Sequence, residues 1–157
     1  MNFNVASIFE RVAQNVPDRE AIICGEARLT YGEFDKRANR VAHYLQSVGI
    51  GKGDHVAIYA FNRLEWVEAM LACYKLCAVP VNVNYRYVED ELQYLLNDAD
   101  VKAIVFEQQF GPLLAAIKQK LPTLKHYIAM EDGSGASLAG LDCVDYSTVI
   151  AQQSDAP

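Results

Sequence analysis

The sequence predicts an α/β fold in which a layered parallel sheet is flanked by helices and preceded by a hairpin. Apolar segments typical of strands begin at residues 55, 79, 102 and 126, which lie 24, 23 and 24 residues apart. A helical stretch separates each pair, and strand–helix–strand units of this kind form right-handed crossovers between parallel strands. The strand cores 56–58 and 103–105 are continuously apolar, as expected for a sheet that is covered on both faces.

The first expected elements are a helix and a hairpin. Apolar residues recur at helical spacing near the N-terminus, namely Val5, Ile8, Phe9 and Val12. Pro17 then acts as a stop signal. Two short strand-like segments, 20–24 and 28–31, lie on either side of a turn at Gly25, which is a hairpin pattern.

A capping box at residues 30–33 predicts the next helix. Thr30 and Glu33 stand three residues apart, so each side chain can bond the backbone amide of the other. The helix would carry one apolar face formed by Phe34, Ala38, Val41, Leu45 and Val48. Gly49 stands where a left-handed residue often ends a helix.

The rest of the chain alternates between strands and helices. The expected strands are 55–59, 79–83, 102–106 and 126–130. The expected helices between them are 64–76, which a second capping box at 62–65 would open, then 88–97 and 110–120. Segment 131–137 is rich in Gly and Ser and predicts a surface loop. A last short helix is expected at 145–153, with Tyr146, Val149 and Ile150 on its apolar side.

Composition and charge exclude several classes of protein. The chain has 157 residues, of which 52% are hydrophobic and 22% charged, so it can form one compact domain with a real core. Its net charge is −6 and it has no basic stripe, which argues against a nucleic-acid partner. No apolar run approaches the ~20 residues of a membrane-spanning helix, so we expect no transmembrane segment.

The cysteines favour a reducing, cytoplasmic location. The four of them are not spaced like a disulfide framework, and the N-terminus lacks the features of a signal peptide. Cys73 and Cys77 would share one face of the predicted helix 64–76. No second Cys or His pair completes a tetrahedral set, so we expect no metal site and interpret these residues as buried free thiols.

Other polar groups are expected to be structural. The glycine-rich segment 49–54 leaves a predicted helix and enters a strand, so it predicts a turn and not a phosphate-binding loop. The three histidines, at 43, 55 and 126, are isolated. The acidic run 89–91 falls in the first turn of a predicted helix, where it complements the helix dipole.

Arg86 is the candidate ligand-binding residue. It lies in segment 82–87, which follows the carboxyl end of a predicted parallel strand, where open α/β sheets bind ligands. It is also the only arginine after residue 63, and a guanidinium beside amide and aromatic groups can hold a phosphate or a carboxylate. The alternative is a surface ion pair with Glu89 or Asp90.

Four collinear segments resemble motifs of the adenylate-forming (AMP-binding) enzymes, which include acyl-CoA synthetases, peptide-synthetase adenylation domains and luciferases. Segment 29–34 (LTYGEF) resembles their motif L-T/S-Y-x-E-L. Segment 49–58 (GIGKGDHVAI) resembles G-V-x-x-G-D-x-V-A-I. Segment 74–86 (YKLCAVPVNVNYR) is similar to K-x-G-A-V-x-x-P-[LV]-N-P-R, and 95–105 continues the match. The likeness is greatest to AMP-forming fatty-acyl-CoA synthetases.

The resemblance implies a role for Arg86. This residue matches the Arg of the N-P-R element, which in some relatives lies near the nucleotide of coenzyme A, so a contact with a CoA phosphate is implied. The sequence departs from the pattern at Tyr85, where Pro is common, and at Cys77, where Gly is usual.

The resemblance also implies a two-step reaction in the full-length protein. ATP and a fatty acid, or another small carboxylic acid, give an acyl-adenylate and pyrophosphate, and CoA then displaces AMP to form the thioester. The implied cofactors are ATP, Mg²⁺ and CoA. The family's ATP-binding and catalytic motifs have no counterpart in this sequence. We therefore expect residues 1–153 to form an N-terminal subdomain, incomplete in itself, and 154–157 to be a linker toward a phosphate-binding loop. We expect no catalytic residue, no tight cofactor binding and no activity in this chain alone.

Two alternatives stay open. One is a stand-alone α/β module without catalytic activity, which would form a homodimer or bind acyl-CoA. The other keeps the superfamily but changes the substrate to an amino or aryl acid, because most of the pocket that selects the acid would lie in other sequence.

Overall fold

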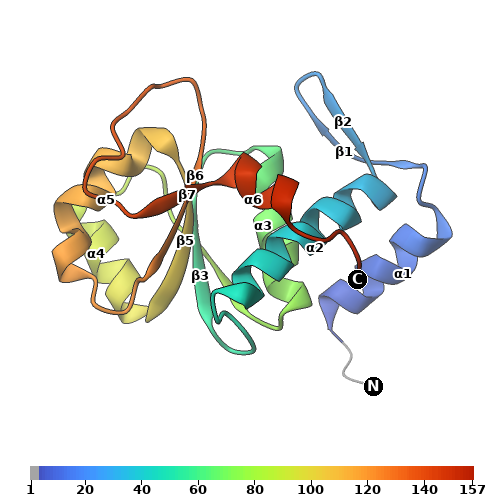
Figure 1. The fold of residues 1–157 in the computed structure, drawn as a ribbon, viewed down its shortest axis with the longest axis horizontal. Coiled ribbons are helices and arrows are strands. Elements are labelled where there is room, and N and C mark those ends of the chain that lie inside the picture. The colour runs from blue at the N-terminus through green and yellow to red at the C-terminus, as the bar shows by residue number, and fades with distance from the viewer. Residues whose placement is uncertain (1–3) are drawn as a thin grey trace.

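A five-stranded parallel sheet forms the centre of the molecule (Figure 1). The computed structural model describes residues 4–157. The strand order is β4-β3-β5-β6-β7, and each neighbouring pair is parallel. The strands are β3 (His55–Tyr59), β4 (Val79–Asn82), β5 (Val101–Glu107), β6 (His126–Met130) and β7 (Cys143–Asp145). The α/β fold expected from the strand spacing is therefore confirmed.

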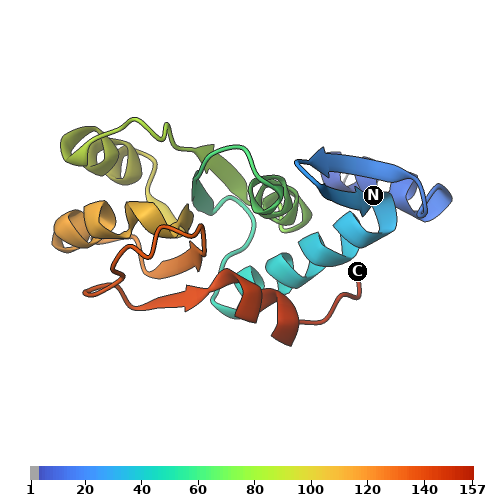
Figure 2. The ribbon, with the colours of Figure 1, turned by 90° about the horizontal axis from the view of Figure 1, so that it is seen from above.

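Helices cover both faces of this sheet (Figure 2). The covering helices are α2 (Tyr31–Ser47), α3 (Leu64–Lys75), α4 (Glu89–Asp98), α5 (Gly111–Ile117) and α6 (Tyr146–Gln152). Helices α2, α3 and α6 pack on one face, and α4 and α5 pack on the other. Strand residues alternate between the two cores, so that Ile58 faces the first and Tyr59 the second. This arrangement explains why the central strands are continuously apolar.

An N-terminal unit packs against the far side of α2. It contains α1 (Val5–Asn15) and an antiparallel hairpin of β1 (Glu20–Cys24) and β2 (Ala27–Thr30). Its small core joins Ala6 of α1 to Phe34 and Ala38 of α2. The helix and the hairpin were both predicted, but the buried face of α1 differs from the expected one. Ala6 and Ala13 are buried, whereas three of the expected apolar residues are exposed, namely Val5, Ile8 and Val12.

The two predicted capping boxes have different outcomes. The first is confirmed, because Thr30 accepts from the Glu33 amide at 3.2 Å and Glu33 accepts from the Thr30 amide at 2.8 Å. The second, at 62–65, is wrong. The helix begins at Leu64 with Arg63 as its N-cap and no side-chain cap. Arg63 itself binds both oxygens of Glu65, at 2.7 and 2.9 Å, so this carboxylate is already occupied.

Two other regions differ from the expected secondary structure. The predicted helix 110–120 is divided into a 3₁₀ turn, the α-helix α5 and a second 3₁₀ turn: η1 (Gln108–Phe110) and η2 (Lys118–Lys120) flank α5. Strand β7 was not predicted, since it has three residues and is defined by pairing with β6. The last helix, α6, was predicted, and its three apolar residues are buried as expected.

Cys77 corrects the expectation that two cysteines share a helix face. Helix α3 ends at Lys75, and Cys77 adopts a left-handed conformation with φ 55°. Cys73 is buried, whereas Cys77 is exposed, so only the first behaves as a buried thiol. Burial raises the pKa of Cys73 to about 12. The left-handed conformation suits glycine better than cysteine.

A buried carboxylate joins three helices on one face of the sheet. The side chain of Glu68 in α3 has no solvent exposure. The Arg37 guanidinium of α2 binds it at 2.5 and 3.2 Å, and the hydroxyl of Tyr146 in α6 donates to it at 2.8 Å. A second ionic group fixes α1, since Lys75 of α3 contacts Glu10 at 2.6 Å and Asp35 at 2.8 Å. Charged groups of this kind are tolerated inside a protein only when such partners are present.

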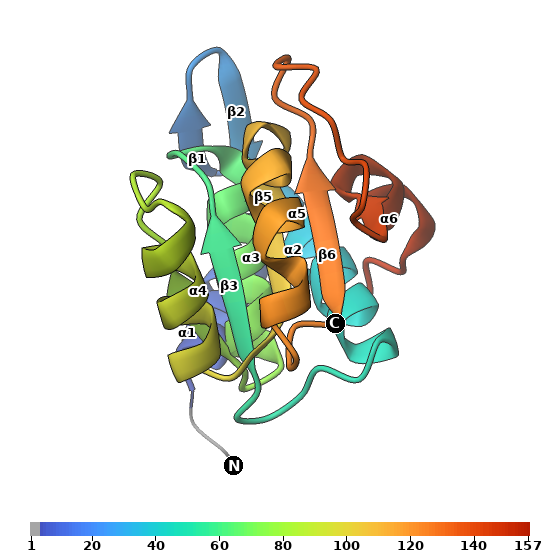
Figure 3. The ribbon, with the colours of Figure 1, turned by 90° about the vertical axis from the view of Figure 1, so that its left-hand side faces the viewer.

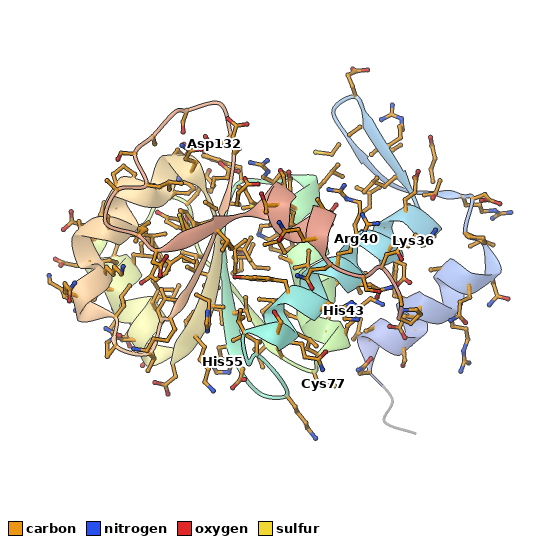
Figure 4. All side chains as sticks on the ribbon, in the orientation of Figure 1. Lys36, Arg40, His43, His55, Cys77 and Asp132 are labelled. Carbon is orange, nitrogen blue, oxygen red and sulfur yellow. The ribbon has the colours of Figure 1, made fainter. Side chains whose placement is uncertain are left out.

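The C-terminal residues lie along α2. Asn39, which is almost fully buried, donates to the carbonyl of Asp155 at 2.9 Å. His43 Nδ1 lies 2.8 Å from the carbonyl oxygen of Ser154, and Arg40 lies 3.4 Å from the Asp155 carboxylate. Figure 4 shows Arg40 and His43 on the α2 surface that this segment follows. Among residues 4–157, no helix has the length and apolar character needed to cross a membrane.

The Glu68 network predicts the effect of Tyr146→Phe on stability. The variant removes one donor from a buried carboxylate, so we expect the free energy of unfolding to fall by about 1–3 kcal/mol. Urea denaturation measures the change. Tyr94→Phe is the matched control, because Tyr94 is 70% exposed, and it should change stability by less than about 0.5 kcal/mol. Equal effects of the two variants would contradict a structural role for the network.

The backbone at residue 77 predicts that Cys77→Gly stabilises the protein. Glycine relieves the strain of the left-handed backbone, and this free-energy gain exceeds the cost of the entropy that glycine adds to the unfolded chain. We therefore expect the free energy of unfolding, measured by urea denaturation, to rise by about 0.5–1 kcal/mol. Cys77→Ala is the control, since it removes the thiol but keeps the Cβ atom. If alanine stabilises the protein as much as glycine does, the conformation of the backbone is not the cause.

Candidate functional site

The carboxyl edge of the parallel sheet holds a group of aromatic and amide side chains. The loops that follow β3 and β4 meet there, because these strands are neighbours and run in the same direction. Figure 3 shows β3 and β6 of the same sheet pointing toward this edge. Chain connections from β3 lead first to β4 on one side and then across to β5 on the other. Such a reversal of strand order opens a crevice at the carboxyl ends of the strands, where α/β proteins bind ligands.

A pocket of about 490 Å³ lies at this edge, next to the ends of β3 and β4. Most of its lining side chains are of two kinds, and Ala60 and Val83 complete it. The amides are Asn62, Asn82 and Asn84, and the aromatic side chains are Phe61, Trp66, Tyr85 and Tyr87. Amides supply both donors and acceptors, whereas aromatic rings supply flat apolar faces. The combination suits a planar ring that carries polar edges.

Two aromatic rings form the exposed wall of the pocket. The ring centroids of Phe61 and Tyr85 are 4.4 Å apart, and the residues are 42% and 41% exposed. Behind them, Tyr59 stacks on Phe110 with centroids 4.0 Å apart, and its hydroxyl donates to the Tyr87 carbonyl at 3.2 Å. Burial raises the pKa of Tyr59 to about 12, so this hydroxyl stays protonated at neutral pH. A rigid inner layer therefore supports an accessible outer one.

Arg86 lies beside this pocket and not in its lining. Its residue is exposed, and its guanidinium carbon lies 5.5 Å from the centroid of the Tyr85 ring. The backbone there is fixed by Asn84, whose side-chain oxygen accepts from the Arg86 amide at 3.0 Å. Among the described ion pairs none includes Arg86, so the alternative of a pair with Glu89 or Asp90 is not observed. The guanidinium is thus available to an anion at the rim of the pocket.

Glu107 supports the pocket from the end of β5, and sequence reasoning missed it. This glutamate is only 4% exposed. It accepts from the Phe61 amide at 3.0 Å and from the Gln109 side chain at 2.6 Å, and the Arg63 guanidinium lies 3.8 Å away. It therefore fixes the turn that carries Phe61. The only signal in the sequence was a charged residue directly after an apolar strand.

Arg63 connects this edge to the loop after β6. Its guanidinium donates to the carbonyl of Glu131 at 3.0 Å. The next residue, Asp132, accepts from the backbone amides of Gln109 and Ser134. Burial opposes ionisation of Asp132, but bonds from Ser134 and Gln109 and the charge of Arg63 outweigh it and lower the pKa. Figure 4 places Asp132 at the end of the sheet opposite to His55 and Cys77.

The other polar groups take structural positions. Asp54 accepts from the Gly51 amide at 2.9 Å and pairs with Lys102 at 2.5 Å, so segment 49–54 is a turn as predicted. His55 Nδ1 contacts the Ala99 carbonyl oxygen. Glu91 in the first turn of α4 accepts from the Val88 amide at 3.1 Å. Within residues 4–157, no three His, Cys, Asp or Glu residues are grouped as a metal site.

Comparisons with known proteins agree with this architecture. The family model described as "AMP-binding enzyme" matches residues 9–150. A medium/long-chain-fatty-acid–CoA/3-oxocholest-4-en-26-oate–CoA ligase of Mycobacterium marinum is 41% identical over 96% of this chain and 28% of its own length. A 3-oxocholest-4-en-26-oate–CoA ligase of Rhodococcus rhodochrous is 38% identical over 98% of this chain. The chain spans about 28% of the length of these curated relatives.

Solved structures show the same fold. The anthranilate CoA ligase AuaEII, in complex with anthranoyl-AMP, superimposes with a TM-score of 0.88 at 25% identity, over 99% of this chain and 29% of that one. A protein described as a putative long-chain-fatty-acid CoA ligase from Rhodopseudomonas palustris superimposes with a TM-score of 0.84 at 30% identity, over 99% of this chain and 37% of that one. The family match covers residues 9–150, which is nearly the whole chain, and this chain therefore belongs to the AMP-binding enzyme family.

Proposed function

We propose that the chain is the N-terminal part of an AMP-forming fatty-acyl-CoA synthetase, which converts a fatty acid, ATP and CoA to acyl-CoA, AMP and pyrophosphate. The observation that carries this proposal is the 38–41% identity to fatty-acid and cholestenoate CoA ligases over 96–98% of the chain. An amino or aryl acid is a weaker alternative, since the anthranilate ligase is only 25% identical.

The residues of this chain fit the proposed cofactors unequally. ATP needs backbone amides that converge on its phosphates, usually in a glycine-rich loop between a strand and a helix. In the described residues, the glycine-rich segment 49–54 instead leaves α2 and enters β3. We therefore assign no contact with ATP, or with the Mg²⁺ that accompanies it, to this chain. No residue of it receives a catalytic role.

Coenzyme A fits the carboxyl-edge pocket better. Its adenine is a planar ring with polar edges, which matches the aromatic and amide lining, and its phosphates match the unpaired Arg86 at the rim. Arg86 is thus our proposed contact for a CoA phosphate. In the complete enzyme, CoA supplies the thiol that takes up the acyl group, and the residues of this chain would hold and orient its nucleotide end.

The proposed domain organisation follows from the same comparison. Residues 1–153 would form an N-terminal subdomain, and 154–157 would lead to the rest of the enzyme. The contacts of Ser154 and Asp155 with α2 support a defined exit path for the chain. We also propose a cytoplasmic location, with which four cysteines without a disulfide are consistent. A homodimer is a further part of the proposal.

The proposal predicts where activity resides. The purified 157-residue chain should give no pyrophosphate exchange with ATP, Mg²⁺ and fatty acids, whereas a protein extended to the length of the relatives should form acyl-CoA. Assays with fatty acids of several lengths, a cholestenoate and anthranilate identify the acid. Adenylate formation by the short chain would contradict the proposal. An extended protein without ligase activity, together with a dimeric short chain in light scattering, would favour the non-catalytic module.

The position of Arg86 predicts a selective effect of Arg86→Ala in the extended enzyme. Loss of a charge-assisted hydrogen bond should raise the KM for CoA roughly 10-fold and leave the KM values for ATP and acid within about 2-fold. Arg28→Ala is the matched control, because Arg28 lies on the hairpin and its side chain is 49% exposed. Equal effects of both variants on CoA, or a change in the KM for ATP alone, would remove Arg86 from the CoA site.

A further inference from the structure

Asn39 is a buried polar residue that takes no part in the site described above. It lies in the middle of α2, and it is only 3% exposed. The other residues on the buried face of this helix include Ala38, Val41, Ala42 and Leu45, which are all apolar. Asparagine is unfavourable in helix interiors, and a buried amide costs free energy unless it is hydrogen-bonded. An interaction that offsets both costs is therefore expected.

The Asn39 amide holds a part of the chain that is distant in the sequence. Its Nδ2 group donates to the carbonyl of Asp155 at 2.9 Å, and the two residues are 116 positions apart. One turn further along α2, His43 Nδ1 lies 2.8 Å from the carbonyl oxygen of Ser154. A carbonyl oxygen can only accept, so Nδ1 carries the proton of this bond. Side chains of one helix thus bind two successive carbonyls of the C-terminal segment.

These two bonds are the main polar contacts that hold segment 154–157 on α2. Within residues 4–157, no backbone–backbone hydrogen bond outside the helices and strands involves this segment. A chain that follows a last helix is mobile unless other groups hold it. Arg40 adds an ion pair with Asp155 at 3.4 Å, but the two side chains are 34% and 45% exposed, so this pair contributes little.

We propose that Asn39, together with His43, is a positioning residue for the chain that follows residue 157 in the extended enzyme. This inference rests on the proposed function, in which the ATP-binding and catalytic groups lie outside this chain. Segment 154–157 connects the sheet and its carboxyl-edge pocket to that other part, so its attachment to α2 sets where the other part begins. Misplacement of reacting groups by about 1 Å can lower a rate roughly 100-fold.

Backbone order parameters of the 157-residue chain, from ¹⁵N NMR relaxation, test whether the segment is held. We expect about 0.8 at residues 154 and 155, close to rigid backbone, and less than about 0.6 in Asn39→Ala. Alanine removes the amide and is the best helix former, so α2 is kept. His43→Ala is the second variant, and it should also lower both order parameters.

Lys36→Ala is the matched control for both variants. Lys36, labelled in Figure 4, is exposed on the same helix, and in the described part of the chain no hydrogen bond or ion pair joins it to segment 154–157. Circular dichroism and urea denaturation establish that each variant is folded. The proposal is wrong if residues 154 and 155 are already flexible in the unchanged chain. It is also wrong if they stay rigid in both Asn39→Ala and His43→Ala, or if Lys36→Ala releases them equally.

In the extended enzyme, the same variants separate positioning from substrate binding. Release of the segment should lower kcat roughly 10-fold in Asn39→Ala, because the reacting groups are less well aligned, and leave the KM values for CoA and acid within about 2-fold. Lys36→Ala should change neither quantity. An unchanged kcat in Asn39→Ala would overturn the positioning role. An extended protein that is inactive before any substitution contradicts the proposed function instead, because the order parameters of the short chain do not depend on catalysis.

Discussion

The buried carboxylate of Glu68 is the constraint on which the packing of one whole face of the sheet depends. Water does not reach this group, so its charge must be balanced by protein donors. These come from Arg37 in α2 and Tyr146 in α6, which are far apart in the sequence. The three helices can cover the sheet only in the arrangement that brings these groups together. Lys75 extends the same principle to α1 through Glu10 and Asp35.

A second constraint follows from the parallel sheet. All carboxyl ends of the strands lie at one edge. The loops after β3, β4 and β5 therefore meet there, although they are far apart in the sequence. Glu107 uses this geometry, since it ends β5 and binds the amide of Phe61, which follows β3. The turn that presents the aromatic wall is thus fixed by a strand that lies beside it in the sheet.

The two edges of the sheet differ in chemistry. Amides and aromatic rings gather at the carboxyl edge, with Arg86 at the rim. At the amino edge, two lysines and the Asp142 carboxylate lie in the lining of a smaller pocket. Family membership accounts for the fold, whereas CoA binding at the first edge is our proposal.

Local patterns in the sequence determined the elements themselves. Apolar runs at regular intervals were sufficient to place β3 and β6 to the residue, and Thr30 with Glu33 was sufficient to place the start of α2, because these signals act between near neighbours. Tertiary structure alone decided the rest. The three-residue strand β7 is defined only by its pairing with β6. Arg63 binds the Glu65 carboxylate that was expected to cap α3. Cys77 lies outside the helix whose face it was expected to share with Cys73. The Glu68 network and both pockets likewise join residues more than 20 positions apart, and no periodicity in a single sequence specifies such distances.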